Sequence, residues 1–271
     1  MQPARTITAA PLIEGFSSRR LQSDLHMHPA RIAELLQPFL SSPCHSEPSR
    51  RRGEEPPVLS ATQLQSISTY IDILLHWNAR INLTAIRNEE EIVTRHFGES
   101  LFVASRLFPR VSSAFSAPSA VKNLDVAEAR VADLGSGAGF PGVPIKLWAP
   151  NIALTLIESN QKKATFLREL SRTLTLTDVN IQNVRAESLP PSTFDVVTLR
   201  AVERLPKILP IAASLLTPSA RLALLIASNQ LDTTRSSLPN LSWEPPIPIP
   251  QSQSRLLLIG SAESQKGKQV E

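Results

Sequence analysis

The sequence has 271 residues, of which 42% are hydrophobic and 19% charged, a composition typical of a globular protein rather than a disordered chain. Its formal net charge of +4 allows an anionic partner such as nucleic acid but does not require one. The single cysteine, Cys44, rules out an intrachain disulfide and, with five scattered histidines, argues against a metal site. The sequence has no apolar run long enough to span a membrane and no secretory signal, so we expect a cytoplasmic protein.

Residues 1–57 are predicted to be a disordered leader and a flexible insertion with one short helix. The polar segment 1–29 leaves open a disordered leader, a transit peptide or a start placed too far upstream. The segment 41–57 is dense in Ser, Pro and charge. Its arginines at 50–52 fit a solvated linker or, alternatively, a contact with RNA phosphates. Helical spacing predicts a short amphipathic helix that contains Ile32, Leu35, Leu36, Phe39 and Leu40.

Residues 58–110 are predicted to form a helical subdomain. A capping box at 60–63 places the start of its first helix at the serine. A second cap at 88–91 begins a helix that runs to about Leu107. The Ser/Ala-rich segment 111–128 is predicted to be a loop insertion. The apolar stripe of the first helix consists of Leu64, Ile67, Ile71, Leu74 and Leu75.

From residue 129 onward, apolar runs alternate with helical patterns, which indicates an α/β domain with a parallel sheet over 129–262. A flexible tail is predicted over 263–271. No helix fits between the last two runs, so these should pair as an antiparallel hairpin at the sheet edge, where the prolines at 245–250 are tolerated. The predicted strands are 130–134, 152–158, 179–184, 194–200, 219–227, 243–249 and 254–260, and the predicted helices are 142–149, 160–175 and 203–216.

A glycine-rich turn follows the first predicted strand. Asp133 ends the apolar run, and Gly135, Gly137, Gly139 and Gly142 follow within the next nine residues. Glycine permits positive φ and a close approach by a ligand, which would meet free N–H groups at the start of the next helix. Acid-x-Gly-x-Gly-x-Gly is the turn of methyltransferases that use S-adenosylmethionine (AdoMet). The carboxylate of Asp133 suits the cationic ammonium group of that ligand.

The second predicted strand ends in Glu158, which is placed to accept hydrogen bonds from ribose hydroxyls. Two other interpretations of the glycine turn remain open. Residues 137–142 match G-x-G-x-x-G, the dinucleotide fingerprint, which would favour an NAD-dependent oxidoreductase. The turn could also do no more than reverse the chain.

Ligands of open α/β sheets bind at the carboxyl ends of the strands, so the residues just after each strand are candidates for binding. The backbone at 185–187, after the third strand, could contact an adenine ring. Arg200, after the fourth strand, could hold a nucleotide phosphate or a base oxygen. A salt bridge to Glu203 or a plain surface charge is the alternative. No G-x-S-x-G elbow and no P-loop occur in the sequence, which leaves a hydrolase triad without an anchor.

These motifs resemble the ribosomal RNA small subunit methyltransferase G family, also called glucose-inhibited division protein B, over roughly residues 60 to 260. The run at 133–145, Asp-Leu-Gly-Ser-Gly-Ala-Gly-Phe-Pro-Gly-Val-Pro-Ile, resembles the family signature. Phe-Pro-Gly after the glycine loop is specific to this family among methyltransferases. The other segments that resemble the family lie at 77–86, 95–100, 200–202 and 255–259.

The resemblance implies a Rossmann-like seven-stranded AdoMet-dependent methyltransferase sheet with an N-terminal helical addition. It also implies methyl transfer to N7 of a guanosine in 16S rRNA, with that RNA or an assembling small subunit as the partner of a monomer. The implied AdoMet-binding residues are Asp133, Gly135, Gly137, Gly139, Phe140, Glu158, Ala186 and Glu187. The implied acceptor-side residues are Arg200, which would be catalytic, with Arg95, His96 and Asn82.

Two departures from the family pattern stand out. Glu99 replaces a frequent Asp, and Ile226-Ala227 replaces a common Lys-Gly after the fifth strand, which would weaken RNA binding or pass that task to another residue. Methylation of a small molecule or another RNA, or RNA binding without catalysis, therefore stays open.

Guanine N7 carries a lone pair and needs no general base, so alignment of N7 with the methyl group can supply much of the rate acceleration. An arginine bound to both N7 and O6 would block attack, so Arg200 is predicted to hold O6 or a phosphate.

Overall fold

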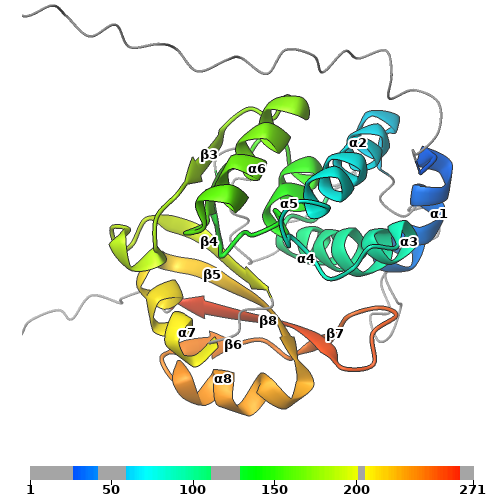
Figure 1. The fold of residues 1–271 in the computed structure, drawn as a ribbon. Coiled ribbons are helices and arrows are strands. Elements are labelled where there is room, and N and C mark those ends of the chain that lie inside the picture. Colours follow the sequence, from blue (N-terminus) through cyan, green and yellow to red (C-terminus); the bar gives the residue numbers. More distant parts are fainter. Residues whose placement is uncertain (1–26, 42–58, 111–128, 201–204, 263–271) are drawn as a thin grey trace, which may run out of the picture.

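The structure is a computed structural model in which a central β-sheet carries helices on both faces (Figure 1). This is the layered arrangement of an α/β sandwich. The sequence therefore predicted the fold class correctly, including the helical addition at the N-terminal side. The predictions for the leader, the two insertions, the tail and Glu203 concern residues outside the described ranges, apart from the short helix near residue 35. The structure describes residues 27–41, 59–110, 129–200 and 205–262.

The sheet follows the order β3-β2-β1-β4-β5-β8-β6. The first five of these strands pair in parallel, and β8 pairs antiparallel with both β5 and β6. A short β7 also pairs with β8. The strands are β1 Arg130–Leu134, β2 Ala153–Ile157, β3 Val179–Gln182, β4 Phe194–Arg200, β5 Leu216–Ala227, β6 Leu241–Trp243, β7 Ile247–Pro248 and β8 Arg255–Ala262.

The strand predictions hold closely, and the antiparallel hairpin at the sheet edge is confirmed. Two details differ. The predicted strand 243–249 is divided into β6 and β7, because prolines interrupt it and cannot donate to a ladder. β5 begins at Leu216 rather than at 219 and ends with Ile226 and Ala227, and Ile226 is buried. The position at which the family commonly has a lysine is therefore part of the sheet in this chain.

The N-terminal helices begin at the predicted caps. The Ser60 hydroxyl accepts the N–H of Gln63, whose side-chain oxygen accepts the N–H of Ser60. The second predicted helix is continuous, but its middle turn is a π-helix, which sequence patterns do not reveal and which often marks functional sites. These elements are α1 Pro29–Leu40, α2 Ala61–Asn78, α3 Glu89–Glu91, the π-helix Ile92–Gly98 and α4 Glu99–Leu107.

Helices connect the parallel strands, as predicted, but one helix had no predicted counterpart. This is α8, which follows β5; only its Thr234 is buried, so its sequence shows little apolar periodicity. The remaining elements are α5 Gly142–Trp148, α6 Gln161–Thr173, the 3₁₀ helix Ala186–Ser188, α7 Leu205–Ser214, the 3₁₀ helix Ser228–Gln230 and α8 Leu231–Ser237.

The two faces of the sheet have separate hydrophobic cores. One core joins α1, α2, α4, α5 and α6 to the sheet, and the other joins α7 and α8 to it. Figure 1 shows the same division, with α1 to α6 on one side and α7 and α8 on the other. The N-terminal helices are thus built into one layer of the α/β sandwich. No helix in the described ranges is long and apolar enough to cross a membrane.

The register of the strands brings several predicted site residues to one edge of the sheet. Leu134 pairs with Ile157 and with Leu199, so β1, β2 and β4 end at the same level. Ala227 at the end of β5 pairs with Arg255 at the start of the antiparallel β8. This carboxyl edge is where ligands of open α/β sheets bind.

Candidate active site

The glycine loop after β1 needs glycine at three positions. Gly135, Gly137 and Gly139 have φ values of 68°, 53° and 91°. A Cβ on Gly139 would collide with the hydroxyl of Tyr70, whereas a Cβ on Gly135 would meet nothing within 4 Å. The loop therefore packs tightly against α2 at its far end and leaves open space over its beginning, where a ligand could approach the backbone.

Tyr70 and Phe140 join this loop to the N-terminal helices. The Tyr70 hydroxyl donates to the Ala138 carbonyl at 2.5 Å, and the two rings stack with their centroids 5.1 Å apart. Phe140 also stacks on His96 at 4.8 Å and meets the Phe97 ring edge-on. Phe140 was predicted to bind the cofactor, but these contacts place its ring in an aromatic cluster within the core.

Asp133 holds the start of α5. Its Oδ2 accepts the N–H of Gly142 at 3.2 Å, its Oδ1 accepts the Thr198 hydroxyl at 3.0 Å, and the residue is only 1% exposed. Burial raises the pKa of Asp133 to about 7, although these hydrogen bonds favour the carboxylate. The prediction of free N–H groups at the helix start is wrong. The N–H of Gly142 donates to Asp133, and the N–H of Val143 donates to the Gly139 carbonyl.

Glu158 reaches back across the glycine loop from the end of β2. Its Oε2 accepts the N–H of Gly137 at 2.9 Å, and its Oε1 accepts the N–H of Asn160 at 2.7 Å. Each carboxylate oxygen has two lone pairs, so both oxygens keep the capacity to accept another donor. A Cβ on Gly137 would lie 3.9 Å from Oε2. The carboxylate thus borders the space over the loop.

The third predicted element of the cofactor site follows β3. Asn183 donates its side-chain N–H to the backbone carbonyl of Glu158 at 2.8 Å, which brings this segment beside the glycine loop. Ala186 is buried in a 3₁₀ turn, and Glu187 next to it is exposed. The segment follows β3 in the chain, and its role in binding an adenine stays a prediction.

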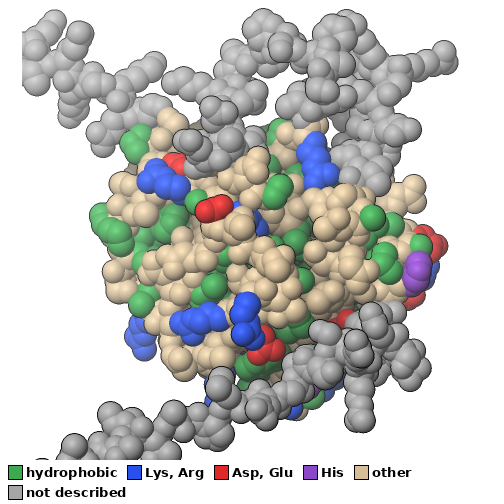
Figure 2. All heavy atoms as spheres, turned by 90° about the horizontal axis from the view of Figure 1, so that it is seen from above, with side chains coloured by type: hydrophobic (Ala, Val, Ile, Leu, Met, Phe, Trp, Pro, Cys, Tyr) green, Lys and Arg blue, Asp and Glu red, His purple; other side chains and the backbone are tan. Residues whose placement is uncertain are grey.

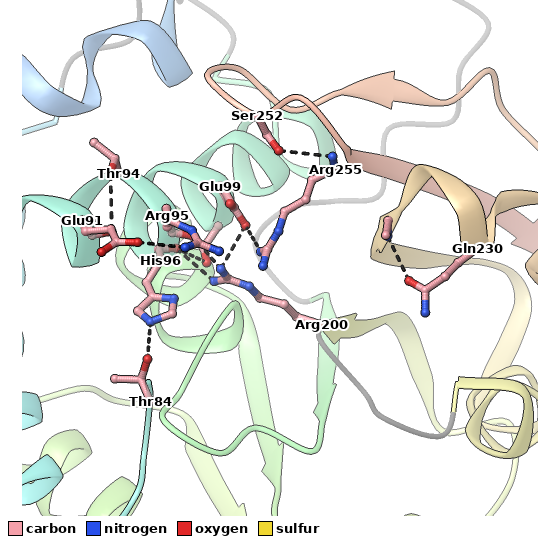
Figure 3. Close-up of polar contacts among 12 residues, drawn as sticks. Thr84, Glu91, Thr94, Arg95, His96, Glu99, Arg200, Gln230, Ser252 and Arg255 are labelled. Carbon is pink, nitrogen blue, oxygen red and sulfur yellow. Dashed lines mark hydrogen bonds and ion pairs between the residues drawn. The ribbon is translucent and has the colours of Figure 1, made fainter. Parts of the chain in front are cut away.

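Arg200, at the end of β4, is held by partners on the N-terminal helices. Its Nη2 donates to Glu99 Oε2 at 2.9 Å and to the Arg95 carbonyl, and its Nη1 donates to the His96 carbonyl (Figure 3). Burial lowers its pKa to about 10. The side chain is only 6% exposed. The predicted alternative of a plain surface charge does not describe this buried arrangement, and Glu203 lies outside the described residues.

The other predicted acceptor-side residues differ in position. His96 Nε2 lies 2.7 Å from the Thr84 hydroxyl, and burial followed by the charge of Arg200 lowers the pKa of His96 to about 3, so its ring is neutral. The side chain of Arg95 is half-exposed and pairs with Glu91 at 2.8 Å. Asn82 is exposed in the loop after α2. The structure thus groups His96 with Arg200 and leaves Asn82 outside that group.

Several residues without a predicted role build this edge. Asn78 fixes the loop before Asn82, since its side chain bonds to the backbone of Leu83 and Thr84. Glu99 and Arg255 form the centre of the polar cluster with Arg200. Glu99 and Arg255 both lie in segments that resemble the family, and this resemblance was the only sequence feature that pointed to them. No local sequence pattern predicted that their side chains are in contact.

The described residues offer no group of three or more His, Cys, Asp or Glu that could hold a metal ion. A cavity of about 660 Å³ lies at the opposite, amino-terminal edge of the sheet, beside the end of α5. There Lys146 Nζ donates to the Pro150 and Ile152 carbonyls, and Arg110 stacks on Trp148 at 3.9 Å. The positively charged side chains of this cavity, Lys146 and Arg110, thus already contact other residues of the protein. The cavity also lies at the edge of the sheet opposite the glycine loop.

Comparison with known proteins identifies the family. The family model of rRNA small subunit methyltransferase G matches residues 63–237, more than half of the chain. The chain belongs to the rRNA small subunit methyltransferase G family. This match includes the glycine loop, Glu158, Glu99 and Arg200, but Arg255 lies beyond it.

Relatives named ribosomal RNA small subunit methyltransferase G share 38% identity over 163 residues in Desulfitobacterium hafniense (strain Y51) and 39% over 148 residues in Xylella fastidiosa (strain 9a5c). These matches cover 58% and 54% of the chain, but only 60% and 61% of the two relatives. A third, from Xanthomonas euvesicatoria pv. vesicatoria (strain 85-10), is 35% identical and covers 63% of the chain and 72% of the relative. Among solved structures, a ribosomal protein L11 methylase from Lactobacillus delbrueckii subsp. bulgaricus has a TM-score of 0.48 at 16% identity, covering 62% of this chain and 79% of that one.

Proposed function

We propose that the chain is an AdoMet-dependent methyltransferase that transfers a methyl group to N7 of a guanosine in 16S rRNA of the small ribosomal subunit. The observation that carries the proposal is the open space over Gly135, next to the Gly137 amide that donates to the Glu158 carboxylate, on the same edge of the sheet as Arg200. Membership of the rRNA small subunit methyltransferase G family supports the RNA substrate.

The residues at this edge fit AdoMet. The backbone of Gly135 and Gly137 leaves room for the amino-acid part of the ligand, and Glu158 keeps lone pairs for ribose hydroxyls. The 3₁₀ turn at the buried residue Ala186 would border the adenine. Asp133 would act through the loop rather than by contact with the ammonium group, because its carboxylate is already engaged with Gly142 and Thr198.

When bound, AdoMet supplies an electrophilic methyl group on a sulfonium. The chain itself needs to bring guanine N7 into line with that methyl group, because N7 has a lone pair and no proton to lose. The neutral ring of His96 and the anchored guanidinium of Arg200 border the acceptor side. Arg95 and Asn82 lie farther out, where they could contact the RNA chain. We expect the enzyme to act as a monomer in the cytoplasm.

The proposal is tested with purified protein, labelled AdoMet and 16S rRNA or small subunits from cells that lack the active gene. We expect one 7-methylguanosine per 16S rRNA, detected by mass spectrometry of nuclease digests. Calorimetric titration with AdoMet and with NADH provides the control. Tight binding of NADH and no binding of AdoMet would instead favour the oxidoreductase interpretation of the glycine turn.

A further inference from the structure

Glu99 is a buried carboxylate that joins two arginines at the acceptor edge. Its Oε2 accepts from Arg200 Nη2 at 2.9 Å and from Arg255 Nη1 at 2.6 Å, and the Glu99 side chain is 4% exposed (Figure 3). The three residues come from α4, the end of β4 and the start of β8. One oxygen atom therefore fixes the position of two guanidinium groups that distant parts of the chain supply.

The two arginines differ in how far they reach solvent. Arg200 is 6% exposed and gives its donors to Glu99 and to the carbonyls of Arg95 and His96. These carbonyls belong to the π-helical turn, a geometry that is frequent at functional sites. The side chain of Arg255 is 29% exposed, and its Nη1 donates to Glu99 Oε2. Arg255 is thus the member of the cluster that can contact a large ligand.

The rest of the site favours an anionic ligand at Arg255. Two arginines share one carboxylate, so the cluster keeps a net positive charge. The backbone N–H of Arg255 donates to the Ser252 hydroxyl at 3.2 Å, which fixes the start of β8. Figure 2 shows one face of the molecule, on which Lys and Arg side chains are spread out and several lie near Asp or Glu side chains. A guanidinium group whose position is already fixed by a carboxylate suits phosphate binding, because its side chain loses less rotamer freedom when the phosphate binds.

We propose that Glu99 is a positioning residue that holds Arg255 at the rim of the acceptor site, where the outer N–H groups of Arg255 bind a phosphate of the RNA substrate. The buried Arg200 pairs with the same Glu99 carboxylate and so helps to fix its position. This inference rests on the proposed function, and it goes beyond the roles that the resemblance implies for Arg200, Arg95, His96 and Asn82.

The test compares Arg255→Gln, Glu99→Gln, Glu99→Asp and the double variant Glu99→Gln/Arg255→Gln. RNA affinity is measured with a 16S rRNA fragment over a range of salt concentrations, and KM and kcat are measured with the same RNA. We expect Arg255→Gln and Glu99→Gln each to raise the KM for RNA about tenfold with AdoMet affinity nearly unchanged, and Arg255→Gln to leave kcat nearly unchanged as well. Each should lower the slope of log affinity against log salt by about 1, as expected for one lost phosphate contact.

The double variant decides whether Glu99 acts through Arg255. We expect its RNA KM to match that of Arg255→Gln, because neighbours that share one role are not additive. Glu99→Asp keeps the charge and should restore part of the affinity; it takes the place of Glu99→Gln in the cycle if the glutamine variant does not fold. The matched control is Arg130→Gln, which removes an arginine paired with Asp195 at the opposite edge and should leave the KM unchanged.

Additive effects on the KM for RNA, or an unchanged salt slope in Arg255→Gln, would overturn the inference. So would Glu99 variants that lose only thermal stability, since a purely structural ion pair predicts that result. Failure of the proposed function looks different, because the wild-type protein itself would then place no methyl group on 16S rRNA. The salt slope of RNA binding is measured without turnover, so it tests the contact separately from the reaction.

Discussion

Two buried titratable residues near the glycine loop have pKa values shifted in opposite directions. Burial raises the pKa of Asp133 to about 7. Burial, and then the charges of Arg200, Arg95 and Arg255, lower the pKa of His96 to about 3. In both cases the folded protein favours the neutral side chain, because a charge is poorly solvated there. The contributions of Asp133 and His96 to the unfolding free energy therefore change with pH in opposite directions.

The stabilising effect of Asp133 is complete below about pH 4 and is lost as the pH rises to about 7. That of His96 is complete above about pH 6.5 and is lost as the pH falls toward 3. We predict that the unfolding free energy of Asp133→Asn, relative to wild type, rises between pH 4 and 7, by up to a few kcal/mol. The relative value for His96→Gln should fall between pH 3 and 6.5. Urea denaturation at a series of pH values measures both, and parallel profiles would contradict the prediction.

At the scale of elements, the glycine loop connects the N-terminal helices to the sheet. Its Gly139 lies under Tyr70 of α2, while Gly135 faces open space. Both have positive φ, so both pay a similar conformational penalty when replaced by alanine, about 1 kcal/mol. What differs is the space that a methyl group would enter. The loop therefore has one end that serves packing and one end that faces the proposed ligand.

Alanine substitutions separate these two ends. We predict that Gly139→Ala lowers the unfolding free energy by about 1–3 kcal/mol more than Gly135→Ala does, because its methyl group meets Tyr70 and Val143. Gly135→Ala should keep most of its stability and lose AdoMet affinity at least about tenfold, because its methyl group enters the ligand space. Chemical denaturation and calorimetric titration measure the two effects. Equal losses of AdoMet affinity and stability in both variants would refute this assignment.

At the scale of the whole molecule, α1 is part of the main core although it lies in a region predicted to be mostly disordered. Ile32, Leu36 and Phe39 are buried, and a Cβ on Gly98 would come within 2.6 Å of the Phe39 ring. The helix thus packs directly on the π-helical turn before Glu99. Its apolar spacing predicted the helix, but only the structure shows which surface it covers.

Removal of the Phe39 ring tests this packing. Phe39→Ala should lower the unfolding free energy by about 3–5 kcal/mol, since it leaves a cavity between α1 and the π-helix. Gln37→Ala on the exposed side of the same helix is the control and should change stability by less than about 0.5 kcal/mol. A similar, small effect of both substitutions would show that α1 contributes little to the folded core.

Much of the fold was readable from short segments. The cap at Ser60, the glycine turn and the acid at Glu158 are each encoded within a few neighbouring residues, so their positions followed from the sequence. Contacts between distant segments were not readable. Asp133 was expected to face a ligand but caps α5, because only the folded sheet brings Thr198 beside it. The partners of Glu99 depend in the same way on strand order.

The pairing of β8 between β5 and β6 has a consequence for synthesis of the protein. Glu99 and Arg255 are 156 residues apart, and β8 is the last described strand. The Glu99–Arg255 contact closes a long loop of the chain, so it cannot form from interactions between neighbouring residues alone. A nascent chain that has already formed its glycine turn still lacks the Glu99–Arg255 pair until the segment that contains Arg255 has left the ribosome. The proposed phosphate contact of Arg255 therefore forms only after β8 has been synthesised and paired.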